Sequence, residues 1–233
     1  MTEASNEATT IKMAYDKLDR LIRVEYPGGF YFKYEYDGDN KRTSRTDQDG
    51  RRIQYYYGIG RYLIYIRDIT NQTNIVWYSY YADTNRLNKK WAPTLSGPYT
   101  IYEYDDAGQL LHLTNYDSNG TYDPNDDHIL SGFDYTYDLA GNRLTMNTLE
   151  GLHQYAYDEL GQLTEVTYPD GRHVEYEYDS AGNRTQVIDN NSVASYVTNN
   201  LNQYTDVNGH SCTYDLNGNL TSDVTPENCT IVD

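Results

Sequence analysis

The sequence predicts an all-β protein, and the prediction depends on a recurring turn signal, on alternation between turns and on the lack of a helical pattern. Tyr-Asp is followed by Gly at a fixed distance in five segments, which start at residues 104, 137, 157, 178 and 214. Between two of these turns, residues 173–178 read HVEYEY, so that Val174, Tyr176 and Tyr178 share one face. A period of two with β-branched and aromatic residues is typical of half-buried strands. We therefore expect an antiparallel meander of β-hairpins, because short strands joined by tight turns pair with their neighbours.

The turn signal recurs about every 21 residues through the chain, which predicts about ten repeats. Its tyrosine position is occupied by Tyr15, Tyr36, Tyr56 or Tyr57, Tyr81, Tyr104, Tyr137, Tyr157, Tyr178, Thr198 and Tyr214. Its glycine position is occupied by Asp19, Asn40, Gly60 or Arg61, Asn85, Gly108, Gly141, Gly161, Gly182, Asn202 and Gly218. Gly, Asn and Asp tolerate a left-handed backbone best. The second column therefore predicts a turn residue with positive φ in each repeat.

Each repeat has a second turn signal between two Tyr-Asp turns, as at Pro27-Gly28-Gly29, Asp49-Gly50 and Pro169-Asp170-Gly171. One repeat is then a strand, a turn, a strand and a Tyr-Asp turn. We expect the Tyr to end its strand on the buried face and the Asp to accept hydrogen bonds from the turn amides. The structural residues of the clearest repeats are Tyr104, Asp105, Gly108, Tyr137, Asp138, Gly141, Tyr157, Asp158, Gly161, Tyr178, Asp179, Gly182, Tyr214, Asp215 and Gly218.

Composition limits the possible partners and the cellular location. The chain has 28 Tyr and a net charge of −17, so we expect a core built from rings and a strongly acidic surface. An acidic surface argues against nucleic acid as a partner, because phosphates would be repelled. No apolar run is long enough to span a membrane. Residues 1–10 read as a disordered tail without the apolar core of a signal peptide, and residues 11–233 read as one β domain.

The sequence offers no catalytic or metal-binding motif, so we predict no enzyme activity, no cofactor and no metal. The insertion 116–133 places Asp117, Asn119, Thr121 and Asp123 in an alternation that suggests calcium, but Tyr122 and His128 stand where an EF-hand needs Gly and Glu. A polar hairpin loop is the favoured interpretation. The two cysteines, Cys212 and Cys229, are compatible with one bridge and equally with two free thiols.

Carbohydrate binding is the functional alternative to a purely structural role, because sugar rings stack on flat aromatic side chains. Residues 75–103 hold both tryptophans and depart from the repeat pattern. The candidate glycan-binding residues are Trp77, Tyr78, Tyr80, Trp91 and Tyr99. The competing interpretation, which we favour, is that the two tryptophans fill the core where the repeat is irregular.

Two segments resemble a known family. The segment YDELGQLTEVTYPDGRHVEYEYDSAGNRTQV (157–187) is similar to the RHS or YD-repeat family, and NNLNQYTDVNGHSCTYDLNGNLTSD (199–223) resembles a segment common near the end of bacterial arrays. The resemblance covers residues 11–225. It implies a β-meander curved into part of a shell or an open barrel, as a segment of a bacterial repeat array.

The resemblance also implies a role and partners. The chain would be a structural scaffold in a secreted or surface-exposed bacterial protein, a shell wall around or beside an effector domain, with its secretion signal outside this chain. Flanking repeats, an enclosed effector domain, and a glycan or cell-surface polysaccharide are the partners that it implies. A carbohydrate-binding module on the same scaffold is the alternative.

Overall fold

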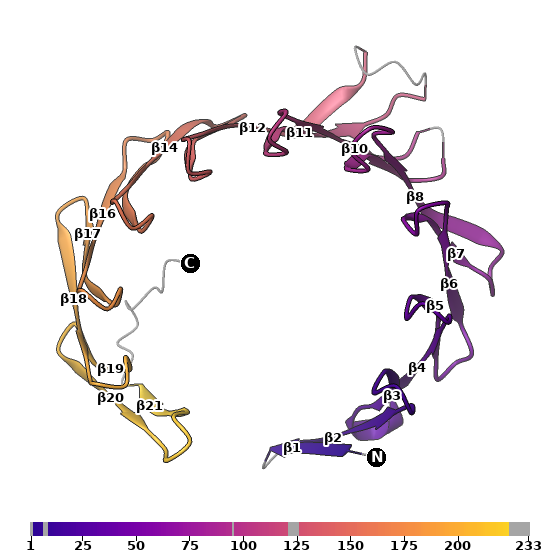
Figure 1. Cartoon of the computed structure of the whole chain (residues 1–233), viewed down its shortest axis with the longest axis horizontal. Coiled ribbons are helices and arrows are strands. Elements are labelled where there is room, and N and C mark those ends of the chain that lie inside the picture. The colour runs from indigo at the N-terminus through magenta and orange to yellow at the C-terminus, as the bar shows by residue number, and fades with distance from the viewer. Residues whose placement is uncertain (1, 7–8, 95, 121–125, 224–233) are drawn as a thin grey trace. The chain divides into compact units, whose positions relative to one another are not determined.

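The computed structural model of the chain describes all residues except 1, 7–8, 95, 121–125 and 224–233. The described residues form 21 strands and one short 3₁₀ turn, η1 (Pro27–Gly29). Strands β1 to β10 pair in chain order, each antiparallel to the next. Strands β12 to β21 pair in the same way (Figure 1). The predicted all-β antiparallel meander is confirmed.

Contacts divide the chain into two units. The first comprises Met1–Glu103 and Leu113–Ser131, and the second comprises Tyr104–His112 and Gly132–Asp233. The first unit contains β1 (Thr2–Asn6), β2 (Thr9–Tyr15), β3 (Leu21–Glu25), β4 (Tyr31–Tyr36), β5 (Arg42–Asp47), β6 (Arg52–Tyr57), β7 (Leu63–Asp68), β8 (Thr73–Tyr80), β9 (Leu87–Trp91) and most of β10 (Tyr99–Tyr104). The boundary crosses β11 (Leu110–Asp117) and β12 (His128–Tyr137).

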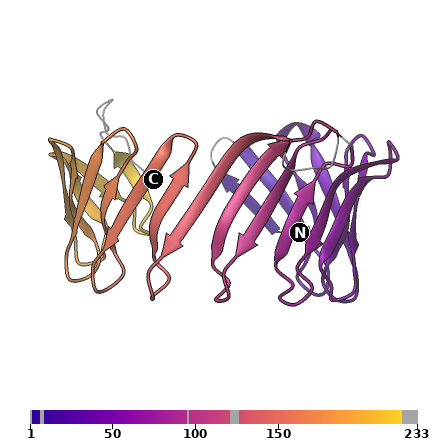
Figure 2. The same cartoon turned by 90° about the horizontal axis from the view of Figure 1, so that it is seen from above.

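The second unit contains nine further complete strands. They are β13 (Arg143–Thr148), β14 (Gly151–Tyr157), β15 (Leu163–Thr167), β16 (His173–Tyr178), β17 (Arg184–Asp189), β18 (Ser192–Thr198), β19 (Tyr204–Val207), β20 (His210–Tyr214) and β21 (Leu220–Asp223). Within each unit the strands run between two edges of hairpin turns, as Figure 2 shows. The assignment of residues 11–233 to one domain stays a prediction.

Strand β1 lies within residues 1–10, where the sequence predicts a disordered tail. It pairs antiparallel with β2, from Thr2 opposite Met13 to Asn6 opposite Thr9. Backbone pairing of this kind requires no apolar side chain, so the polar composition of the segment gave no sign of it.

The left-handed turn residue predicted for each repeat is present at all ten positions, with φ between 56° and 91°. The structure also settles the register of two irregular repeats. In one, Tyr57 ends β6 and Arg61 takes the left-handed position with φ of 69°. In the other, Tyr80 ends β8 and Tyr81 stands where other repeats have Asp. The tyrosine position of this repeat is therefore Tyr80, and its assignment to Tyr81 from the sequence was wrong.

A β-bulge accompanies most Tyr-Asp turns. Tyr36 lies opposite Arg42 while Glu35 lies opposite Ser44, so Thr43 is an extra residue in β5. The same shift recurs at eight other turns. A bulge bends its strand and increases the local twist. Each of these nine turns therefore contributes its own bend, a feature that was not predicted from the sequence.

Among the described residues, all the buried apolar side chains except Tyr99 lie on the face that carries the strand-ending tyrosines, which we call the tyrosine face. In the second unit, Val166, Val174 and Tyr176 form a buried cluster, and Tyr178 and Leu163 pack against it. Val174 is fully buried. Within the described part of the chain, no helix has the length and apolar character to cross a membrane.

Candidate functional site

The strand-ending tyrosines join each repeat to the one before it. Tyr36 donates its hydroxyl hydrogen to the carbonyl oxygen of Leu21 at 2.8 Å, and Tyr178 donates to Leu163 at 2.8 Å. The other bonds of this set run from Tyr57 to Arg42, Tyr80 to Leu63, Tyr137 to Leu110 and Tyr214 to Tyr204. In all six, the acceptor lies six residues after the preceding tyrosine position. We call this set the tyrosine ladder.

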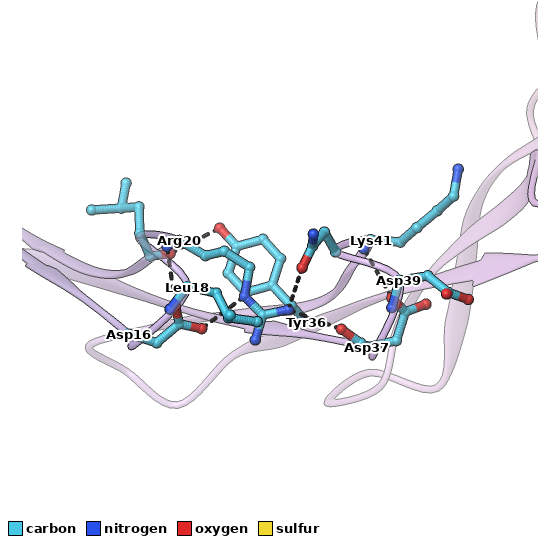
Figure 3. A network of polar contacts seen from close by, with 9 residues as sticks. Asp16, Leu18, Arg20, Tyr36, Asp37, Asp39 and Lys41 are labelled. Atoms are coloured by element: carbon cyan, nitrogen blue, oxygen red, sulfur yellow. Dashed lines mark hydrogen bonds and ion pairs between the residues drawn. The ribbon is translucent and has the colours of Figure 1, made fainter.

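The aspartate of each turn organises the turn backbone. Oδ1 of Asp16 accepts hydrogen bonds from the backbone N–H groups of Leu18 and Arg20, at 2.8 and 3.1 Å (Figure 3). Asp37, Asp138, Asp158, Asp179 and Asp215 accept the same pair of bonds in their own turns. The hydrogen-bonding role predicted for this residue is therefore present in the structure.

A polar residue directly after the left-handed position links successive turns. Arg20 contacts Asp16 in its own turn and donates to the carbonyl of Asp37 and to Oδ1 of Asn40 in the next turn, at 2.9 and 3.0 Å (Figure 3). In the second unit Asn183 plays this part, since its Nδ2 donates to Oδ1 of Asn202 in the next turn at 3.0 Å. This column was not predicted, although Arg, Lys, Gln or Asn fills nine of its ten positions.

The opposite edge of the sheet has its own link between repeats. Arg51 follows a Gly turn and contacts Oδ2 of Asp68 at 2.7 Å, and Arg172 contacts Asp189 at 2.6 and 2.8 Å. Both pairs are separated by 17 residues. Hydrogen bonds from the Arg172 side chain are the main cause that lowers the pKa of Asp189. Both edges therefore carry polar bonds between neighbouring repeats.

Three of the candidate glycan-binding residues meet on the face opposite the tyrosine face. Trp77 lies opposite Trp91, which lies opposite Tyr99 in the next strand. They belong to a row of six rings across β6 to β11: Tyr56, Tyr65, Trp77, Trp91, Tyr99 and Tyr116. We call it the aromatic row.

The rings of the aromatic row pack on one another. Tyr56 and Tyr65 are stacked with centroids 4.2 Å apart, and Tyr99 and Tyr116 are stacked at 4.7 Å. Trp77 lies 4.7 Å from Tyr65 and is nearly parallel to Trp91 at 6.3 Å. Rings stacked in this way turn faces toward each other, so much of the flat surface is used in cross-strand packing.

The other two candidates, Tyr78 and Tyr80, lie on the tyrosine face, because successive residues of a strand point to opposite sides. Tyr80 is part of the tyrosine ladder through its bond to Leu63. Burial raises the pKa of both hydroxyls. The structure thus separates the five candidates into two groups.

The end of the aromatic row is anchored by a buried polar cluster. The hydroxyl of Tyr99 donates to Oδ2 of Asp127 at 2.7 Å, and Nζ of Lys89 lies 3.9 Å from the centre of the Tyr99 ring. The backbone N–H of Asn119 and the Tyr99 hydroxyl lower the pKa of Asp127, which favours its charged form. Burial lowers the pKa of Lys89. This cluster holds the insertion against β10.

A hollow of about 430 Å³ lies beside this cluster, bordered by Val76, Trp91, Pro98 and Leu130 among others. Thr100 and Ser131 belong to its wall and are joined through Asn115: Thr100 donates to Oδ1 of Asn115 at 2.7 Å, and Nδ2 of Asn115 donates to Ser131 at 2.8 Å. Its lining therefore offers a few polar groups and one cation, Lys90, among apolar walls.

The calcium hypothesis involves residues that the structure describes only in part. Thr121 and Asp123 lie outside the described residues, and Asn119 uses its side-chain amide to contact the carbonyl of Asp126. Within the described ranges, no group of three or more His, Cys, Asp or Glu residues has the arrangement of a metal site. Cys229 also lies outside these ranges, so both alternatives for Cys212 stay open.

The geometry defines a class of protein: a tandem β-hairpin repeat in which tyrosine hydroxyls, polar side chains of the turns and two arginine–aspartate pairs join neighbouring repeats. A family model described as RHS Repeat matches residues 15–52 and 157–194. Both segments contain complete Tyr-Asp turns. These two segments of the chain are therefore RHS repeats.

Solved structures share the fold at low sequence identity. The TcdB2-TccC3 protein without its hypervariable C-terminal region aligns with 94% of this chain, with a TM-score of 0.67 and 14% identity. The Tc holotoxin pore of Photorhabdus luminescens aligns with 94% of it, with a TM-score of 0.64 and 15% identity. The chain spans 14% of the length of each of these solved chains. No curated protein sequence matches this one.

Proposed function

We propose that this chain is a wall segment of an RHS-repeat shell, with a structural rather than a catalytic role. The observation that carries the proposal is the tyrosine ladder. Six strand-ending tyrosines use their hydroxyls to bind the backbone of the preceding repeat. The turn aspartates are likewise occupied by backbone amides of their own turns. The residues that define the repeat therefore serve to connect strands.

The setting of this wall follows from the family and from the fold. The matched solved chains are far longer than this one, and one of them is described as part of a Tc holotoxin pore. A wall of this kind would continue into flanking repeats and lie around or beside an effector domain. We place it in a secreted or surface-exposed bacterial protein. A strongly acidic chain, with a net charge of −17, suits a soluble wall.

A glycan-binding module is the second candidate. Its support is the aromatic row, which gathers Trp77, Trp91 and Tyr99 on one face beside a hollow with polar groups in its lining. The stacked geometry argues against it, because a sugar needs an open ring face and the neighbouring rings cover much of that surface. Tyr80 is not available for this role, since its hydroxyl is bound within the ladder.

Retention on immobilised polysaccharides and a glycan array separates the two candidates. The wild type is compared with Trp77→Ala and Trp91→Ala, each with and without calcium, and circular dichroism checks that every variant is folded. A wall predicts no retention for any of them. Retention of the wild type that is lost in a folded tryptophan variant would replace the wall by the glycan-binding module.

Amide hydrogen exchange tests the wall directly. A rigid wall predicts slow exchange in the central strands of each unit, where every strand is paired on both sides. The ladder strands β15 and β16 of the second unit are the most informative, since they carry its buried cluster. Exchange of these amides at the rate of an unstructured chain would show that the segment does not form a wall.

A further inference from the structure

The turns of the second unit carry exposed aliphatic side chains that the fold does not require. Leu139, Leu160, Leu201 and Leu216 have relative exposures of 110%, 81%, 77% and 107%. They occupy the two middle positions of their turns, whereas the turn geometry depends on the Asp or Asn before them and the left-handed residue after them. We call the edge formed by residues 138–142, 158–162, 179–183, 199–203 and 215–219 the YD edge.

The other edge of the same unit is different in composition. Its turns lie near residues 149–150, 169–171, 190–191 and 208–209, and Leu149 is the single strongly exposed leucine among their described residues. If surface leucines were distributed at random, the two edges would carry similar numbers of them. The apolar residues are instead concentrated on the YD edge, which indicates a surface that contacts something.

The YD edge is also acidic in four of its five turns. Its five turn segments contain five acidic residues, at 138, 158, 159, 179 and 215, and no Lys or Arg. Side-chain hydrogen bonds from Asn142, Asn183 and Asn219 are the largest cause that lowers the pKa of Asp138, Asp179 and Asp215. Leucines therefore alternate with carboxylates that stay charged well into the acidic range.

The spacing of these turns matches a helix. Successive turns of the YD edge are two strands apart, which corresponds to about 9.5 Å at the usual strand separation. Seven residues of an α-helix advance about 10.5 Å. A helix that runs along the edge would thus present one side chain of a heptad repeat to each turn, with a mismatch of about 1 Å per step.

We propose that the YD edge of the second unit docks a cationic amphipathic α-helix of a partner protein, with helix leucines against the turn leucines and Lys or Arg beside the turn carboxylates. A second copy of this chain suits the edge less well. Each copy carries a charge of −17, so two copies repel. Four leucines also offer only on the order of 400 Å² of apolar surface, which is small for a stable dimer.

The test uses the whole chain and a defined peptide. The probe is a fluorescein-labelled peptide of 4 heptads (~28 residues), a length of about 42 Å as a helix, with Leu at positions a and d, Lys at e and g, and Ala or Gln elsewhere. Fluorescence anisotropy measures its binding to the wild type and to the variant with Leu139→Ser, Leu160→Ser, Leu201→Ser and Leu216→Ser. We expect at least a tenfold loss of affinity in the fourfold variant, roughly a tenfold change per 1.4 kcal/mol.

Two controls keep this result specific. Leu149→Ser changes a leucine of the other edge and should leave the affinity within twofold of wild type. A peptide of the same composition with its leucines placed off the heptad should bind at least tenfold more weakly. The folding of each variant is checked by circular dichroism, and these exposed positions should tolerate serine.

Several outcomes would overturn the proposal. Equal affinity of the wild type and the fourfold variant would show that the leucines do not contact the helix. Equal binding of a peptide with Glu in place of Lys would remove the role of charge. Leucine-dependent self-association in sedimentation, or leucine-dependent binding to neutral phosphatidylcholine vesicles without peptide binding, would assign the edge to a second copy or to lipid instead.

Discussion

Removing one hydroxyl from the tyrosine ladder should lower the stability of the second unit by a small, defined amount. Tyr178 donates its hydroxyl hydrogen to the carbonyl of Leu163 at 2.8 Å. Its ring packs against the cluster formed by Val166, Val174 and Tyr176. Tyr178→Phe keeps this ring and deletes the hydrogen bond alone. The substitution therefore isolates the bond that joins one repeat to the preceding one.

The size of the effect follows from the partial burial of Tyr178. A neutral hydrogen bond contributes about 0.5–1.5 kcal/mol net, because water competes for the same groups. Water can reach the Leu163 carbonyl in part once the hydroxyl is gone, so we expect a loss of about 1 kcal/mol in the free energy of unfolding. For a chain of this size, that corresponds to a decrease of about 2–4 °C in the melting temperature.

Urea denaturation followed by far-UV circular dichroism measures this loss. Tyr196→Phe is the matched control, because Tyr196 packs on Tyr204 at 5.3 Å and its hydroxyl has no hydrogen bond to a described residue. We expect the control to stay within about 0.3 kcal/mol of wild type, the usual range for a change away from specific contacts. A Tyr178→Phe variant as stable as wild type, or an equal loss in Tyr196→Phe, would refute the ladder as a source of stability.

Three further predictions concern the turns and the aromatic row. Gly182→Ala should cost about 1 kcal/mol in a thermal melt because its φ is +84°, whereas Gly132→Ala, where an added Cβ meets nothing within 4 Å, should be neutral or stabilising. The Asn183 side chain lowers the pKa of Asp179, so the stability that this carboxylate contributes is complete above the unfolded pKa of about 3.9 and is lost as the pH falls through the folded pKa. In an acid titration, Asp179→Asn should therefore lose less stability below about pH 4 than the wild type does. Trp77→Ala should lower the urea midpoint by the equivalent of about 2–3 kcal/mol through lost packing, and an unchanged midpoint would contradict the structural role of the row.

The turns were predictable from the sequence because their requirements are local. A residue with positive φ must be Gly, Asn or Asp in most cases, and the column from Asp19 to Gly218 shows this preference directly. Arg61 is the exception, with φ of 69°, and its neighbour Gly60 made the register ambiguous. Local chemistry therefore predicted the positions of the turns but failed where two left-handed residues are adjacent.

The contacts between repeats were not predictable in the same way. The acceptor of the Tyr178 hydroxyl is 15 residues away, and its identity depends on the bulge that shifts the register at that turn. A bulge has no strict sequence signature in these strands. The polar column after the left-handed residue was visible, but its role requires knowledge that the turns of neighbouring repeats lie side by side.

Only part of the candidate glycan-binding site could be predicted from the sequence. Alternation along β8 places Trp77 and Tyr78 on opposite faces, so the sequence pattern alone argued against one surface containing both. The meeting of Trp77, Trp91 and Tyr99 depends on the pairing of three strands, β8, β9 and β10. The aromatic character of the region was evident, whereas the stacking that covers the ring faces could come only from the structure.

The repeat at Thr198 tests how much the tyrosine ladder contributes to stability, because Thr198 has no phenol at the position where other repeats have Tyr. Every other tyrosine position from Tyr137 onward is aromatic, and Tyr214 donates to Tyr204 in the strand that follows Thr198. The next strands also pair weakly, since β19 and β20 share only two residue pairs. We therefore expect the second unit to open first at β18 and β19, with amide exchange there faster than in β15 to β17. Uniform exchange across these strands would mean that backbone pairing alone holds the repeats together, and that the phenols add little.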